Sequence, residues 1–209
     1  MYENNASVNE LIFNCLERAR EGKDLHSGED RSENKSETMD MQNFFRREEP
    51  VCALDPLLSI PRIEYVEAIL ECIRAKGTKY TLVILDMKNF HWINDVYDYD
   101  TGDRVLAAFI LLLRSGLPTG SISLRFRHGD EFLFFLPLSS GEASGLFAGF
   151  NTYSEQYPFL GKPDGSNFIV SFRFAVVEIT HDNAEARKIL PIAELELRAV
   201  KGQGSTRNT

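Results

Sequence analysis

Residues 121–137 read Ser-Ile-Ser-Leu-Arg-Phe-Arg-His-Gly-Asp-Glu-Phe-Leu-Phe-Phe-Leu-Pro, two short apolar runs separated by a polar turn. Apolar runs on either side of a short turn that contains glycine are typical of a β-hairpin. Asp130 and Glu131 would lie at its tip, where two neighbouring carboxylates create a strong negative potential. Such a pair suits a divalent cation, or a substrate that carries one. The stretch therefore predicts a pair of strands and a candidate metal-dependent site.

The segments around this hairpin are predicted to alternate between helix and strand. Residues 61–76 place apolar side chains at helical spacing and stop at Gly77. Residues 80–85 form a continuous apolar run before Asp86, which is typical of a buried central strand. The other expected elements are helices at 89–95, 102–114 and 140–157, one long strand at 167–179, and a last helix with Pro191 in its first turn that runs to about Lys201. Because helices join most strands but one pair is a hairpin, we expect an α/β (α+β) domain with a mixed sheet.

Length and composition limit the classes of protein to which this chain can belong. With 209 residues, 43% of them apolar, it can bury one substantial core. A formal charge of −8 argues against bulk binding to nucleic acid or to an anionic membrane. The longest apolar run, 106–113, is too short to span a bilayer, and we see no secretion signal. Three widely spaced cysteines form neither a disulfide framework nor a zinc motif, so a reduced, cytoplasmic setting is expected.

The first part of the chain differs in composition from the rest. Residues 1–21 are predicted to hold a short amphipathic helix, with apolar side chains at helical spacing over 7–21. Residues 22–54 are polar and charged, and we expect a disordered linker because they offer too little apolar surface to offset the entropy of ordering. A folded domain over 55–205 and a tail over 206–209 would follow. The helix over 7–21 can pack on its own domain or against a protein partner, and the sequence leaves both open.

Motifs spread along the folded part resemble those of the GGDEF family, the diguanylate cyclases that condense two GTP into cyclic di-GMP. The hairpin segment His128-Gly129-Asp130-Glu131-Phe132 resembles the Gly-Gly-Asp-Glu-Phe motif that names the family. Other segments that resemble family motifs occur before and after the hairpin, in the family's order and spacing, at residues 55–62, 86–95, 97–106, 170–173 and 193–204. The resemblance implies the GGDEF, palm-type nucleotidyl cyclase fold, with a central five-stranded sheet flanked by helices.

The resemblance and the chemistry of the residues together indicate a site for GTP and a divalent metal. Asp86, Asp130 and the Met87 carbonyl supply oxygen ligands suited to Mg²⁺ or Mn²⁺. Backbone amides at Asn89 and Phe90 begin a helix, and amides placed in this way bind phosphate. By resemblance, the remaining roles are guanine recognition by Asn94 and Asp103, close approach of the nucleotide at Gly129, phosphate binding by Lys201, and catalysis by Asp130 and Glu131. Each domain would hold one GTP, so a homodimer is implied for cyclase activity.

Several positions depart from the family's pattern around this site. They are Lys88 in place of an aspartate, His128 and Arg173 in place of glycines, and Ser205 in place of an arginine. Residues 119–122, Thr-Gly-Ser-Ile, replace the Arg-x-x-Asp motif of product inhibition. The changes favour a degenerate domain that binds GTP and Mg²⁺ and acts as a regulatory or interaction module. An active diguanylate cyclase without this product inhibition is the alternative, and another palm-type nucleotidyltransferase is a third.

Overall fold

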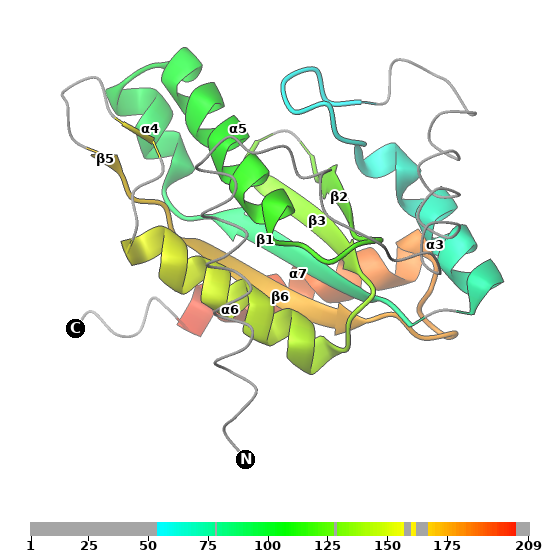
Figure 1. Cartoon of the computed structure of the whole chain (residues 1–209). Coiled ribbons are helices and arrows are strands. Elements are labelled where there is room, and N and C mark those ends of the chain that lie inside the picture. The colour runs from blue at the N-terminus through cyan, green and yellow to red at the C-terminus, as the bar shows by residue number, and fades with distance from the viewer. Residues whose placement is uncertain (1–53, 78, 128, 157–159, 162–166, 204–209) are drawn as a thin grey trace, which may run out of the picture.

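A four-stranded sheet lies at the centre of the computed structural model, which describes residues 54–77, 79–127, 129–156, 160–161 and 167–203. Helices cover both faces of this sheet (Figure 1). In spatial order the strands are β2 (Ile122–Arg125), β3 (Glu131–Leu136), β1 (Thr81–Met87) and β6 (Phe172–Glu178). The helical elements are η2 (Ile63–Tyr65), α3 (Val66–Lys76), α4 (Phe90–Val96), α5 (Tyr99–Ser115), α6 (Ser140–Gln156) and α7 (Ala186–Gln203). A separate small pair is formed by β4 (Leu160–Gly161) and β5 (Asn167–Phe168).

Every neighbouring pair in the central sheet is antiparallel, and β1 lies between β3 and β6. β1 and β2 therefore run in the same direction with β3 between them, while β3 and β6 run in the same direction with β1 between them. The chain passes from β1 to β2 through α4 and α5, and from β3 to β6 through α6. This is the split β-α-β arrangement of a β-α-β-β-α-β domain. It places the end of β1 beside both the hairpin and β6.

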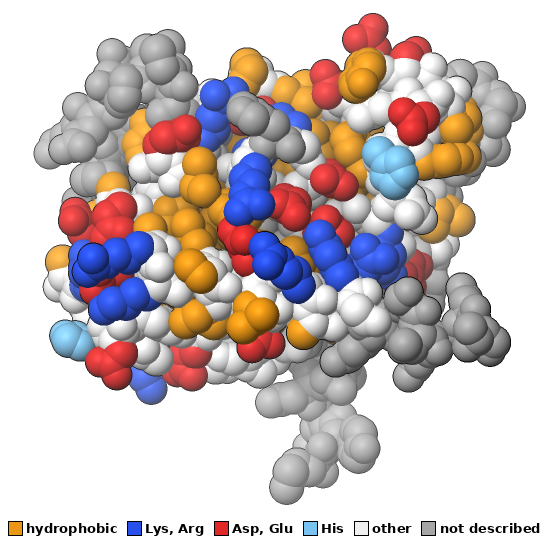
Figure 2. All heavy atoms as spheres, turned by 180° about the vertical axis from the view of Figure 1, so that it is seen from behind, with side chains coloured by type: hydrophobic (Ala, Val, Ile, Leu, Met, Phe, Trp, Pro, Cys, Tyr) orange, Lys and Arg blue, Asp and Glu red, His pale blue; other side chains and the backbone are white. Residues whose placement is uncertain are grey.

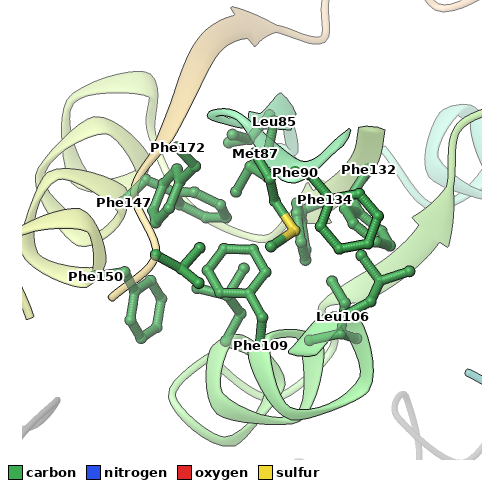
Figure 3. Packing of buried hydrophobic residues seen from close by; sticks show 14 of the residues in the cluster. Leu85, Met87, Phe90, Leu106, Phe109, Phe132, Phe134, Phe147, Phe150 and Phe172 are labelled. Carbon is green, nitrogen blue, oxygen red and sulfur yellow. The ribbon is translucent and has the colours of Figure 1, made fainter. Parts of the chain in front are cut away.

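Side chains alternate between the two faces of the sheet, so each face has its own core. Val83, Leu85 and Met87 of β1 pack with α4, α5 and α6 in a cluster rich in phenylalanine, part of which Figure 3 shows. Leu82 and Ile84 pack on the opposite face with α3 and α7. The even-numbered residues of β1 therefore face α7, and this alternation decides the side on which the strand's acidic end projects.

Local signals explain where the helices around the sheet begin and end. α3 stops at Gly77, whose left-handed backbone (φ 63°) closes the helix. Asp98 caps α5, because its side chain accepts a hydrogen bond from the Thr101 N–H at 2.6 Å. Glu142 of α6 accepts a hydrogen bond from the Ser139 N–H at 2.9 Å. The helix predicted over 61–76 is present as η2 and α3, and the buried strand predicted before the acidic end is β1.

The structure corrects several expectations from the sequence. The described strands form an antiparallel sheet of four, not a mixed sheet of five, because β3 and β1 are inserted between the strands that helices connect. The strand expected over 167–179 is interrupted, since β5 ends at Phe168, β6 starts at Phe172, and Ile169 between them is 63% exposed. The last helix starts at Ala186, so Pro191 lies inside α7, where it removes one backbone hydrogen bond.

Some predictions fall outside the described residues. They concern the helix over 7–21, the linker up to residue 53, the hairpin residue His128, Ser205 and the tail over 206–209. Among the helices that the structure describes, none combines the length and the apolar character that a membrane crossing needs.

Candidate functional site

A hollow of about 470 Å³ lies where β1 ends, beside the hairpin and the start of α4. Most of the site residues predicted from the sequence line it, namely Asp86, Met87, Asn89, Phe90, Asn94, Gly129, Asp130 and Lys201. They come from β1, α4, the β2–β3 turn and α7, which the split topology brings together at one end of the sheet. His91 and Arg173 also line the hollow and are not among the predicted site residues.

Two predicted site residues, Asp103 and Glu131, are not part of this lining within the described ranges. Asp103 occupies an exposed position of α5. Glu131 is the first residue of β3, and its Oε1 lies 3.5 Å from Lys201 Nζ. Glu131 is therefore connected to the hollow through Lys201, while the role of Asp103 in guanine recognition remains a prediction.

The register of the sheet brings acidic and basic residues into one row. Asp86 of β1 lies opposite Glu131 of β3 on one side and Arg173 of β6 on the other. Directly opposed residues of neighbouring strands share a face, and this face is the one that α7 covers. α7 lies behind the sheet in Figure 1, and Figure 2, seen from behind, shows acidic and basic side chains intermixed on that side. The row is thus a direct result of strand pairing.

Both oxygens of the Asp86 carboxylate have a cationic neighbour. Lys201 Nζ lies 2.6 Å from Oδ1, and Arg173 Nη1 lies 3.5 Å from Oδ2. The Asp86 side chain is 12% exposed, against 33% for Arg173 and 34% for Lys201. Low exposure strengthens such ion pairs relative to pairs in open solvent. In this conformation the charge of Asp86 is balanced by the chain itself.

The carboxyl group of Asp130 is less well compensated. Burial raises the pKa of Asp130 above its ordinary value of 3.8, and the negative charges of Asp86 and Glu131 raise it further. A hydrogen bond with its own backbone and the positive charge of Lys201 lower the pKa but do not reverse the shift. A partly buried carboxylate beside two others is an environment that a bound cation would stabilise.

Two arginines on the β2 side of the hairpin attach its turn to other parts of the domain. Arg125 at the end of β2 donates from Nε and Nη2 to the Gly129 carbonyl, at 3.1 and 2.8 Å. Its Nη1 lies 2.8 Å from the buried carboxylate of Asp55, which also accepts two backbone N–H groups of the turn that follows it. Arg127 Nη2 pairs with Glu194 of α7 at 2.5 Å. The hairpin turn is therefore attached both to the segment before α3 and to α7.

The backbone at this end of the sheet includes several left-handed residues. The angle φ is 133° at Gly129, 61° at Arg127 and 57° at Asn89, the residue that caps α4. Glycine adopts positive φ freely and asparagine tolerates it, while arginine does so only under local strain. Residues held in such conformations cluster at functional sites, which agrees with the presence of Gly129 and Asn89 in the lining of the hollow.

Asn94 of α4 is packed against α5 through a glycine. A Cβ at Gly102 would lie 1.8 Å from Asn94 Oδ1, so a larger residue there would force the Asn94 side chain to move. Within the part of the chain that the structure describes, Asn94 Oδ1 is buried without a hydrogen-bond partner. An unpaired buried acceptor costs free energy, and a rotation of the amide would allow a donor from a molecule in the hollow to pair with it. Asn94 is thus equipped to contact a ligand.

The residues of the hollow fit Mg²⁺ or Mn²⁺ as an open site. Across the described ranges, no three His, Cys, Asp or Glu side chains gather as a complete ligand set. Asp86, Met87 and Asp130 nevertheless line one hollow, and each has an oxygen donor, the two carboxylates and the Met87 carbonyl. Mg²⁺ commonly binds through one or two carboxylates together with waters and substrate phosphates. The donors therefore fit a metal that arrives with a nucleotide, once Asp86 is released from its cationic neighbours.

The substituted residues Lys88 and Arg173 have different surroundings, which the sequence did not reveal. Lys88 Nζ lies 3.8 Å from Glu155 of α6, and Lys88 does not line the hollow, whereas Arg173 does. This difference depends on strand register and on which way each side chain leaves the strand end. His91 could have been found from its spacing, because it follows the predicted phosphate-binding residues at the start of α4.

The family of the chain follows from a comparison with family models. A model described as diguanylate cyclase, GGDEF domain, matches residues 63–207, which is more than half of the chain. The chain therefore belongs to the GGDEF family, the diguanylate cyclase-type domains of cyclic di-GMP signalling.

Individual relatives resemble this chain over different lengths. Diguanylate cyclase DgcM of Escherichia coli K12 is 38% identical over 58 residues, which are 28% of this chain and only 14% of DgcM. SiaD of Pseudomonas aeruginosa, a diguanylate cyclase solved in complex with its activator SiaC, has a TM-score of 0.65 at 23% identity, over 97% of this chain and 75% of that chain. The GGDEF domain of DgcB from Caulobacter crescentus, solved with c-di-GMP, has a TM-score of 0.65 at 16% identity, over 75% and 92%. At these identities the solved structures demonstrate a shared fold.

Proposed function

We propose that this chain is a degenerate GGDEF domain that binds GTP with Mg²⁺ and acts as a regulatory or interaction module in cyclic di-GMP signalling. One observation carries the proposal: both oxygens of Asp86 face cations of the chain, Lys201 at 2.6 Å and Arg173 at 3.5 Å. The hollow keeps groups that suit a nucleotide, but its principal carboxylate is already neutralised. Such a site favours binding over rapid metal-dependent turnover.

Each part of the nucleotide has a candidate partner in the hollow. Lys201 would bind phosphate oxygens as a point charge, as lysines commonly do. Asn94 offers both a donor and an acceptor to a guanine edge. Asp86 and Asp130 would hold the metal, which supplies neutralisation of phosphate charge when bound. This division of roles supports GTP rather than an uncharged ligand.

The proposed role as an interaction module and the proposed cellular location each rest on a further observation. The SiaD structure contains a bound activator protein. The present chain can likewise bind a protein partner, through the segment that includes residues 7–21. GTP is present in the cytoplasm, and the cysteines fit a reduced compartment, so we place the protein there.

Calorimetry and a product assay test the proposal together. GTP with Mg²⁺ is titrated into the protein, ATP with Mg²⁺ serves as the control for base recognition, and the same samples are analysed for cyclic di-GMP. We expect saturable GTP binding, weaker ATP binding and no cyclic di-GMP, even at protein concentrations that favour dimers. Steady production of cyclic di-GMP would reject a degenerate domain, and failure to bind GTP would reject the nucleotide role.

An active diguanylate cyclase is the second candidate, favoured by the gathering of Asp86, Asp130, Glu131 and Lys201 at one end of the sheet. If Mg²⁺ and GTP displace the cations from Asp86, the same residues are available for attack of a 3′-hydroxyl on an α-phosphate. Two domains must then face each other in a homodimer. The specific rate should rise with protein concentration in this case and should be zero at all concentrations for the degenerate domain.

A further inference from the structure

We propose that Arg173 is an exchangeable cation of this site: it balances Asp86 when the hollow is empty and binds the phosphates when a metal–nucleotide complex enters. The inference rests on the proposed binding of GTP and Mg²⁺ and adds the residue that couples the two. The resemblance to the family implies a glycine at the position of Arg173, so the role is proposed for the present chain.

The backbone fixes where Arg173 can act. It lies on β6 directly opposite Asp86 of β1, on the face that α7 covers. Its side chain lines the hollow together with Lys201 and is one third exposed, so it has room to move. The guanidinium can therefore reach either the strand-end carboxylate or a group within the hollow without a change in the sheet.

The two cations around Asp86 are held differently. Lys201 Nζ makes the short contact, 2.6 Å, and has a second acidic neighbour in Glu131 at 3.5 Å. Arg173 Nη1 lies 3.5 Å from the other oxygen of Asp86. Arg173 is therefore the cation that leaves with less loss, and its departure frees one carboxylate oxygen for a metal.

The released guanidinium has a natural acceptor. Its planar set of donors matches two phosphate oxygens at once, which an ammonium group does not. Metal alone would have to displace Arg173 into solvent, and phosphate alone would leave Asp86 without this counterion. The metal–nucleotide complex supplies a partner for both groups, so Arg173 makes metal and phosphate bind cooperatively.

Matched variants separate the two halves of this exchange. Arg173→Gln removes the charge, Arg173→Lys keeps the charge but not the planar fork, and Arg187→Gln removes an exposed arginine at the start of α7 that pairs with Glu185. Each protein is titrated calorimetrically with Mn²⁺ alone, with tripolyphosphate in the presence of a chelator, and with GTP plus Mg²⁺. Circular dichroism and thermal melting establish that each variant is folded.

We expect Arg173→Gln to bind Mn²⁺ about threefold to tenfold more tightly and tripolyphosphate about tenfold more weakly than the wild type. Arg173→Lys should leave Mn²⁺ affinity near the wild-type value and weaken tripolyphosphate binding by a smaller factor. Arg187→Gln should match the wild type in every titration. Opposite changes for metal and phosphate are what exchange requires, and they exclude a merely structural role, which would weaken both.

The outcomes also separate this inference from the proposed function. If the wild type binds GTP but Arg173→Gln matches it with both Mn²⁺ and tripolyphosphate, the exchange is wrong and the GTP-binding module stands. If the wild type does not bind GTP, yet the Mn²⁺ and tripolyphosphate affinities shift in opposite directions, the exchange stands for a phosphate ligand other than GTP. If Arg173→Gln does not fold, unchanged tripolyphosphate binding by folded Arg173→Lys overturns the proposal.

Discussion

Two single residues shape the site: Gly102 determines how Asn94 packs, and Asp130 adds a partly buried negative charge. Gly102 allows α5 to approach Asn94 so closely that a Cβ there would lie 1.8 Å from Asn94 Oδ1. Asp130 keeps a carboxyl group in a partly buried, negatively charged environment. The close approach at Gly102 restricts which residues fit there, and the buried negative charge of Asp130 lowers stability. Asn94 and Asp130 both line the hollow, where a bound ligand could pair with them.

Gly102→Ala should be about 1 kcal/mol less stable than Gly145→Ala, because its new methyl group overlaps Asn94 Oδ1 and forces that side chain to move. The free energy of unfolding in urea measures this effect. Gly145→Ala in α6 is the matched control, since a Cβ there meets nothing within 4 Å. The double variant Asn94→Ala with Gly102→Ala should recover part of the loss, and an equal loss in both backgrounds would contradict the steric explanation.

Asp130→Asn should be more stable than the wild type at neutral pH, with the two proteins converging in acid. The folded-state pKa of Asp130 is raised by burial and by nearby negative charge, so the folded protein binds this proton more tightly than the unfolded chain. Stability from that proton is fully present below the ordinary pKa of 3.8 and is lost as the pH rises through the raised value. Urea midpoints over a series of pH values measure the divergence. Parallel curves for the two proteins would disprove it.

At the scale of elements, the turn between β2 and β3 is stabilised by ion pairs with residues outside the hairpin. Its tip is tied by Arg125 to Asp55 near the start of the described chain and by Arg127 to Glu194 of α7. The first pair is largely buried, with side chains 16% and 4% exposed, whereas Arg127 is 56% exposed. The two connections should therefore differ greatly in energy.

Arg125→Ala should cost about 3–5 kcal/mol, because it leaves the buried Asp55 carboxylate without its partner. Arg127→Ala should cost about 0–1 kcal/mol, as expected for an exposed pair. Chemical denaturation measures both. Adding Asp55→Asn to Arg125→Ala should recover part of the stability, since the unpaired charge is then removed, and equal losses for the two arginine variants would contradict this account.

The elements that could be predicted from the sequence are those with a strong local signal. β1 is a continuous apolar run, and the hairpin is two such runs around a turn, so both were predicted correctly. The break at Ile169 was missed because an exposed isoleucine looks like a strand residue in the sequence. The start of α7 was missed because proline usually marks the first turn of a helix.

In the site, too, residues within local motifs could be predicted from the sequence, whereas contacts between distant segments could not. Asp86 and Asp130 belong to motifs, so their neighbourhood could be predicted. The contacts of Arg173 and Lys201 with Asp86 depend on the register of β6 against β1 and on the path of α7. Register is set by the whole hydrophobic pattern and by turn geometry, which explains why the sequence marked Arg173 only as a departure from the family pattern and not as a partner of Asp86.

At the scale of the molecule, the core residues within the part of the chain that the structure describes run from Leu58 to Leu197. A shortened chain that begins at Leu54 should therefore unfold cooperatively and bind GTP as the full chain does. Thermal melting and calorimetry test this expectation. A chain that begins at Leu57 is the control, because it lacks Asp55 and should lose stability through unpaired Arg125. A non-cooperative transition in the chain from Leu54 would show that earlier residues are needed for the fold.

The central place of β1 in the sheet has a consequence for the order of events during synthesis. The hairpin of β2 and β3 joins neighbouring segments, but β1 pairs with β6 across most of the domain. Pairings between distant segments form slowly, since the loop between them must close first. During synthesis, Asp86 therefore has neither Arg173 nor Lys201 as a partner until β6 and α7 have left the ribosome. The charge balance of the hollow is completed only after α7, which carries Lys201, has been synthesised.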